Sequence, residues 1–172
     1  MTAYVALLRA VNVAGTGKLP MAELRAMAQG LGLANVRTYI ASGNLLFESA
    51  LSEREVKAAL ETQIEAYAGK YVPIFVRTAA EMAAVRAVDP FPDAHGSRHM
   101  VYFLDAAPPQ ETQQTARDQA GELIALGLRE IYVYYGDGIR FTKLKLAATK
   151  RGTARNMNTV AKLVAMMSLK GG

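Results

Sequence analysis

The first thirty residues combine two patterns of hydrophobic positions. Residues 3–8 (AYVALL) form a short continuous apolar run, which is typical of a buried strand. In residues 21–32, Leu24, Met27 and Leu31 recur at helical spacing, and a glycine closes the segment. The pattern therefore predicts a strand followed by an amphipathic helix.

The next fifty residues continue this alternation of strands and helices. NVRTYIA and NLLFES are two short strand-like runs, and the Ser-Gly-Asn turn at 42–44 between them tolerates the positive φ of a tight hairpin. Ser52 and Glu55 form a capping box for a second helix, which ends near Gly69, and PIFVR at 73–77 predicts a further strand. The resulting order βαββαβ is that of a ferredoxin-like subdomain.

A proline-rich stretch at 89–96 (DPFPDAHG) separates the second half of the chain from the first. We expect an α+β protein with a ferredoxin-like βαββαβ subdomain over 1–92 and a second βαββ-plus-helices subdomain over 93–172. No letter-by-letter repeat relates the two. The elements expected in the second half are a strand at 98–104, a polar helix at 108–121, two strands in ELIALG and REIYVYY, and helical segments at 142–148 and 156–168.

Charge is distributed unevenly within a net charge of +5. From Arg129 onward there are nine Lys or Arg against only Glu130 and Asp137, whereas the preceding residues hold 11 basic and 13 acidic side chains. This distribution predicts a basic patch that meets nucleic acid, a phosphorylated ligand or another anionic surface. The alternative is a solvated basic face with no partner.

Several classes of protein are excluded by what the chain lacks. It has no cysteine, so disulfides, thiolate metal sites and cysteine nucleophiles are absent. Its first residues lack a signal-peptide pattern, and no run reaches the roughly 18 apolar residues of a membrane helix, so we expect a cytoplasmic protein without a membrane partner. His95 and His99 have too few neighbouring ligands for zinc. We therefore expect no metal and no cofactor, and the sequence indicates no catalytic residue.

The stretch NVAGTGKLP at 12–20 resembles a phosphate loop without matching one. It lacks the glycine spacing and the Ser or Thr of a P-loop, and the third glycine of a dinucleotide fingerprint. The glycines still leave backbone N–H groups beside a helix N-terminus, so Arg9, Asn12, Gly15 and Lys18 form a candidate anion site. The alternative is a flexible loop in which the glycines only permit the bend.

A second candidate anion site lies near the end of the chain. It consists of Lys143, Arg151, Arg155 and Asn156, within a segment that is rich in Lys, Arg and Thr. Arg155 can grip a phosphate with two parallel hydrogen bonds, and the helix expected after it adds free N–H donors. The preceding tyrosines at 132–135 either stack on bases or fill the core as alternate residues of a strand.

Several motifs together resemble one bacterial family. They are YVALLRAVNVAG, KLPMAELRAMAQGLGLANVRTYIASGNLLFES, YVYYGDGI, TKL and TARNMNTVAKL. On these motifs the chain resembles the family catalogued as domain of unknown function 1697 over nearly its whole length. The resemblance implies an α+β structure with a ferredoxin-like portion and no established reaction.

Two functions remain open at this point. The first is a binding protein for a phosphate-bearing partner, either nucleic acid or a nucleotide-like ligand. The second is a small enzyme whose anionic substrate is bound between the two subdomains by Arg9, Asn12, Lys143 and Arg155. The sequence identifies neither the ligand nor the oligomeric state, and fold class alone does not decide between these functions.

Overall fold

The computed structural model describes residues 1–9, 19–136 and 142–168. The chain divides into two compact units, one formed by Met1–Met82 with Leu163–Gly172 and the other by Ala83–Lys162. We call them unit 1 and unit 2 and describe each by itself. The expected subdomain boundary after residue 92 lies C-terminal to the point at which the chain leaves unit 1.

Unit 1 contains the predicted βαββαβ order. Its four strands form one antiparallel sheet, sheet A, in the order β2-β3-β1-β4, which is the ferredoxin-like arrangement. The prediction for this half of the chain is therefore confirmed. The elements are β1 (Thr2–Leu8), α1 (Met21–Gly30), β2 (Ala34–Thr38), β3 (Asn44–Ser49), α2 (Glu53–Ala68) and β4 (Ile74–Thr78), and α3 (Ala79–Ala87) follows them.

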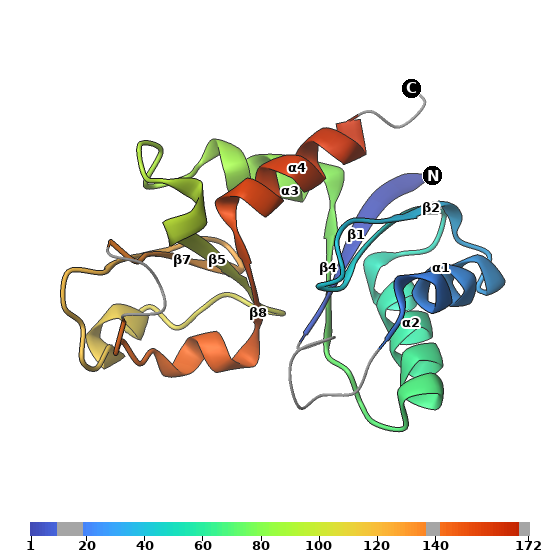
Figure 1. The fold of residues 1–172 in the computed structure, drawn as a ribbon, viewed down its shortest axis with the longest axis horizontal. Coiled ribbons are helices and arrows are strands. Elements are labelled where there is room, and N and C mark those ends of the chain that lie inside the picture. The colour runs from blue at the N-terminus through green and yellow to red at the C-terminus, as the bar shows by residue number, and fades with distance from the viewer. Residues whose placement is uncertain (10–18, 137–141, 169–172) are drawn as a thin grey trace. The chain divides into compact units, whose positions relative to one another are not determined.

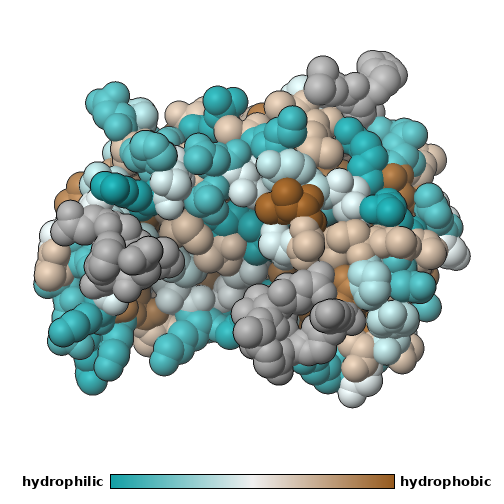
Figure 2. All heavy atoms as spheres, viewed as in Figure 1, coloured by the Kyte–Doolittle hydropathy of each residue, from teal (hydrophilic) through white to brown (hydrophobic). Residues whose placement is uncertain are grey.

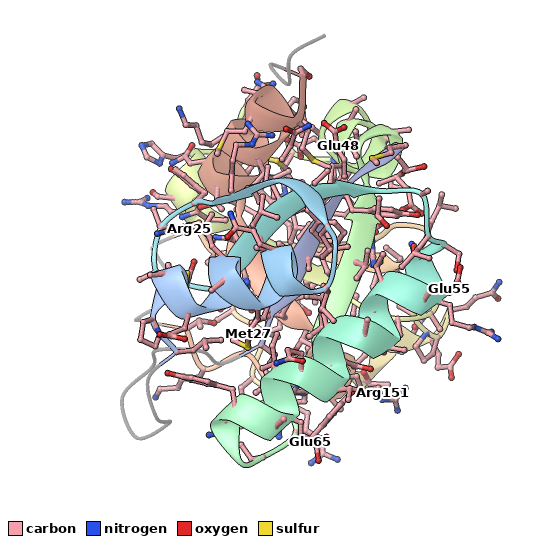
Figure 3. All side chains as sticks on the ribbon, turned by 90° about the vertical axis from the view of Figure 1, so that its right-hand side faces the viewer. Arg25, Met27, Glu48, Glu55, Glu65 and Arg151 are labelled. Carbon is pink, nitrogen blue, oxygen red and sulfur yellow. The ribbon has the colours of Figure 1, made fainter. Side chains whose placement is uncertain are left out.

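Both long helices of unit 1 cover the same face of sheet A, as Figures 1 and 3 show. Leu24 and Met27 of α1 and Val56, Leu60 and Ile64 of α2 are buried against alternate residues of β1, β3 and β4. The 3.6-residue period of the helices and the two-residue period of the strands direct these side chains to one layer. This layer is the hydrophobic core of unit 1.

Local signals in the sequence set several boundaries of these elements. Ser52 and Glu55 form the predicted capping box. The backbone N–H of Glu55 donates to Ser52 Oγ over 3.2 Å, and the backbone N–H of Ser52 donates to Glu55 Oε1 over 3.0 Å. Helix α2 ends at Gly69, whose φ of 75° is left-handed. Gly43 has a φ of 88° in the turn between β2 and β3, as the hairpin prediction requires.

Unit 2 contains a second four-stranded antiparallel sheet, sheet B, in the order β6-β7-β5-β8. This is the strand order of sheet A, with β5, β6, β7 and β8 in the places of β1, β2, β3 and β4. Short 3-10 turns replace the two crossover helices. The elements are η1 (Gly96–Arg98), β5 (His99–Phe103), η2 (Thr112–Thr115), β6 (Leu123–Leu126), β7 (Glu130–Tyr134), η4 (Ala147–Arg151) and β8 (Thr153–Asn156). Helix α4 (Met157–Ser168) follows them, and its residues from Leu163 on belong to unit 1.

The last strands of the two sheets share a further detail. Arg77 in β4 pairs with Val5 of β1, and Arg155 in β8 pairs with Val101 of β5. Both arginines are buried, and each donates from Nη1 to the carbonyl of the residue before it, over 3.1 Å for Arg77 and 2.8 Å for Arg155. A helix follows each strand, so the two units repeat one topology although their sequences differ.

The helix predicted for residues 108–121 is wrong. Only Thr112–Thr115 form a 3-10 turn, after which Ala116 is extended and Asp118 adopts a left-handed φ of 55°. The segment has almost no apolar residue at helical spacing to bury, and an isolated polar helix of this length is marginal in water.

The helix predicted for residues 142–148 is also wrong, and a strand in the following stretch was missed. Lys143 and Lys145 are exposed while Leu144 packs on the unit 2 core and Leu146 is buried in it, which is the two-residue period of an extended chain. Residues 153–156 form β8 because β5 offers them a partner, whereas their own sequence, TARN, has no strand-like alternation. The predicted C-terminal helix is confirmed as α4.

Candidate functional site

The structure describes one of the four residues expected in the N-terminal anion site. Asn12, Gly15 and Lys18 lie outside the described residues. Arg9 follows β1 in unit 1, where it is partly buried and its backbone N–H donates to the carbonyl of Pro73 over 3.0 Å. The candidate residues of the other site, at 143–156, all belong to unit 2.

Two of those C-terminal residues have roles inside unit 2. Arg155 is 7% exposed and donates from Nη1 to Thr153 Oγ1 and to the carbonyl of Ala154, both over 2.8 Å. Burial lowers the pKa of Arg155 to about 10, which leaves its guanidinium charged at neutral pH. Asn156 Oδ1 accepts a hydrogen bond of 2.9 Å from the backbone N–H of Thr159, as a helix N-cap does for α4. Arg155 is thus placed in the interior rather than on the open surface.

The lysines before η4 are presented to solvent by an extended chain. Lys145 forms an isolated antiparallel bridge with Arg117, with reciprocal backbone hydrogen bonds of 2.9 Å and 2.8 Å. Residues paired directly in this way project their side chains to the same side. The bridge therefore brings Arg117, which the sequence pattern did not indicate, beside Lys145.

A buried carboxylate holds the start of this extended chain. Glu122 is 7% exposed and accepts hydrogen bonds from the Thr142 hydroxyl and from the backbone N–H of Ala120. These bonds, first of all the one from Thr142, lower the pKa of Glu122. Thr142 Oγ1 in turn accepts from the backbone N–H of Leu144 over 3.1 Å. The stretch that carries the lysines is thereby anchored to unit 2.

Between residues 117 and 151, five exposed cations have side chains that make no hydrogen bond or ion pair with any other residue the structure describes. We call them the basic segment. All five are exposed. The face shown in Figure 2 has a mixture of hydrophilic and hydrophobic side chains. The basic segment consists of Arg117, Lys143 and Lys145, with Lys150 and Arg151 at the end of η4.

The interior of unit 2 holds a pair of titratable groups that was not evident from the sequence. His99 is fully buried in β5, and its Nδ1 lies 3.3 Å from Asp89 Oδ1. The rings of Phe91 and Tyr132 surround the imidazole, with centroids 5.2 Å and 5.9 Å away. Neither ring nitrogen of His99 has a hydrogen-bond partner of good geometry among the described residues. The pair is 10 residues apart in the chain, and only the fold brings it together.

The burial of His99 predicts that the stability of the protein depends on pH. Desolvation lowers the pKa of His99 below 6.5, and the nearby Asp89 carboxylate opposes the shift without cancelling it. Below pH 6.5 the unfolded chain therefore binds the proton more readily than the folded one, so the free energy of unfolding falls as the pH drops. We expect urea unfolding to show this loss in the wild type and a smaller loss in His99→Phe.

The exposed histidine provides the control for that experiment. His95 lies in the open at the start of η1, where its Nδ1 accepts from the backbone N–H of Ser97. His95→Asn is expected to keep the pH dependence of the wild type. An unchanged slope in His99→Phe would show that another group causes the loss.

The ionisable residues that the structure describes form no metal site. In residues 1–9, 19–136 and 142–168, no three His, Asp or Glu side chains gather closely enough to hold an ion. Helices long and apolar enough to cross a membrane are likewise absent from this part of the chain.

The two sheets with one strand order, together with the basic segment, define an α+β protein built from two units. The chain belongs to the DUF1697 family of proteins of unknown function, whose model matches residues 1–132. It is similar in structure to the conserved bacterial protein SP0830 from Streptococcus pneumoniae, with a TM-score of 0.79, 24% identity, and coverage of 96% of this chain and 98% of that one. That likeness is one of fold. Comparison with curated proteins produced no match.

Proposed function

We propose that unit 2 binds single-stranded nucleic acid through the basic segment. The observation that carries this proposal is the bridge between Arg117 and Lys145. Like charges placed directly opposite each other repel, and neither side chain is neutralised by a described acidic residue. A phosphate between them would relieve this repulsion, and a chain of phosphates would extend the same interaction to Lys143, Lys150 and Arg151.

Lysine and arginine contribute to such binding in different ways. The lysines supply point-charge attraction to successive phosphates, and Arg117 and Arg151 can each hold one phosphate with two parallel hydrogen bonds. Because phosphate contacts release bound counterions, the affinity must fall steeply with salt.

The test is fluorescence anisotropy of a labelled mixed-sequence RNA, titrated with protein over a range of salt. The variant Lys143→Ala/Lys145→Ala/Arg151→Ala removes three exposed cations. We expect the slope of log binding constant against log salt concentration to become shallower by about 2. At low salt, its affinity is expected to decrease by about tenfold or more.

A second triple variant controls for net charge. Arg54, Lys70 and Arg86 are exposed, make no side-chain interaction with a described residue, and lie outside the basic segment. Their replacement by alanine is expected to leave binding close to that of the wild type. Equal losses in both variants would mean that overall charge causes the binding, and an absence of binding at low salt would refute the proposal and leave a small anionic ligand as the alternative.

A further inference from the structure

Beside the basic segment, unit 2 has an open groove of about 490 Å³. One ring, two aliphatic side chains and three primary amides line it, and none of the lining residues that the structure describes is charged. This lining suits a flat heterocycle, which needs apolar contact on its face and hydrogen bonds at its edge. The lining residues are Phe91, Gln113, Gln114, Gln119, Leu123 and Ile124.

The aromatic ring of the groove is held in place from behind. Phe91 packs edge-on against His99, with centroids 5.2 Å apart, and its ring is tilted against Tyr134 at 6.4 Å. Its backbone N–H donates to Asp89 Oδ1 over 2.8 Å. A ring fixed in this way provides a stacking surface without losing rotamer freedom when a ligand binds.

Hydrogen bonds orient two of the three amides. Gln113 Nε2 donates to the carbonyl of Ile124 over 2.9 Å, and Gln119 Nε2 donates to the carbonyl of Glu122 over 2.6 Å. Because a carbonyl accepts only, the nitrogen must be the atom that faces it in both cases. Each Oε1 is then left as an acceptor with no donor among the described residues. The groove is consequently richer in acceptors than in donors.

The groove and the basic segment share one stretch of chain. Residues 113–119 contribute the three glutamines to the groove and Arg117 to the basic segment. A single-stranded nucleic acid whose phosphates contact Arg117 and Lys145 would therefore carry its bases past the groove.

We infer that the groove receives one unpaired base of the bound strand and selects bases that carry an exocyclic amino group. This inference rests on the proposed function and specifies its ligand. The base stacks on Phe91, and its amino group donates to Oε1 of Gln113 and Gln119. Cytosine and adenine have this amino group, whereas uracil presents a carbonyl oxygen in its place.

The test compares oligocytidine with oligouridine of equal length by anisotropy, at slightly alkaline pH so that cytosine stays unprotonated. We expect the wild type to bind oligocytidine about tenfold more tightly, since one well-placed contact to a base discriminates by about that factor. In Gln113→Met/Gln119→Met the ratio of the affinity for oligocytidine to that for oligouridine is expected to fall close to one, while oligouridine binding persists. Gln29→Met/Gln63→Met, two exposed helical positions in unit 1, should keep the wild-type ratio.

The outcomes separate this inference from the proposed function. If the wild type binds both oligonucleotides equally, and the triple variant of the basic segment weakens both, the proposed function stands and the base-selective groove is refuted. If the wild type binds neither oligonucleotide at low salt, the proposed function and the base-selective groove are both refuted. The wild-type ratio alone decides the first case, so a double variant that folded poorly would not obscure the result.

Discussion

Replacing Gly152 by alanine is expected to destabilise the protein by about 2–3 kcal/mol, as overpacking of a well-packed interior typically does. A Cβ at this position would lie 2.2 Å from the backbone oxygen of Phe103 and 2.6 Å from Leu104 Cδ2. The oxygen belongs to β5 at its pairing with β8, so relief of the clash requires these two strands to separate at Phe103 and Thr153. Urea unfolding followed by circular dichroism would measure the loss.

Gly30→Ala is the matched control for this prediction. Gly30 is the last residue of α1, and a Cβ there would meet nothing within 4 Å. Alanine costs less conformational entropy than glycine in a helix, so this variant should be unchanged or more stable by up to about 1 kcal/mol. Equal stability of the two variants would mean that β5 and β8 tolerate a wider separation than the structure shows.

The second large effect is expected for Arg155→Ala, which should lower the free energy of unfolding by about 3 kcal/mol. The substitution removes two short hydrogen bonds from a charged donor, to Thr153 and to the carbonyl of Ala154. It also leaves a cavity, because the side chain is buried along its length. The same urea experiment measures this change.

Arg151 distinguishes a role in stability from a role in binding. It lies four residues before Arg155 but is exposed, and its side chain has no described partner. Arg151→Ala is expected to change stability by no more than about 0.5 kcal/mol while weakening RNA binding. If Arg155→Ala were as stable as the wild type and still lost RNA binding, Arg155 would act at the surface, as the sequence analysis first suggested.

The sequence was most informative where signals are local. Three features depend on residues within a few positions of one another, and each was predicted: the Ser52–Glu55 capping box of α2, the glycine turn at 43 and the C-terminal helix α4. The helices predicted at 108–121 and 142–148 were wrong for a related reason. Both segments contain residues that tolerate a helix, but the first has almost no apolar residue at helical spacing to bury. In the second, core-facing leucines alternate with exposed lysines, as they do in an extended chain.

The candidate site was predictable only in part. The basic character of the C-terminal third followed from composition, and Lys143 and Arg151 are exposed as a surface site requires. Arg117 and the groove at Phe91 were not predictable, because a bridge between residues 117 and 145 and contacts from residue 91 to residues 99 and 134 exist only in the folded chain.

The sequence by itself determined the βαββαβ order of unit 1, its caps and turns, and the excess of positive charge near the end of the chain, because these depend on short-range patterns and counts. Tertiary structure alone decided that residues 153–156 become the fourth strand of a second sheet with the same order as the first. It also decided that Arg155 is buried while Arg117 joins the exposed lysines. Those outcomes depend on strand pairing across many residues, which a local pattern does not encode.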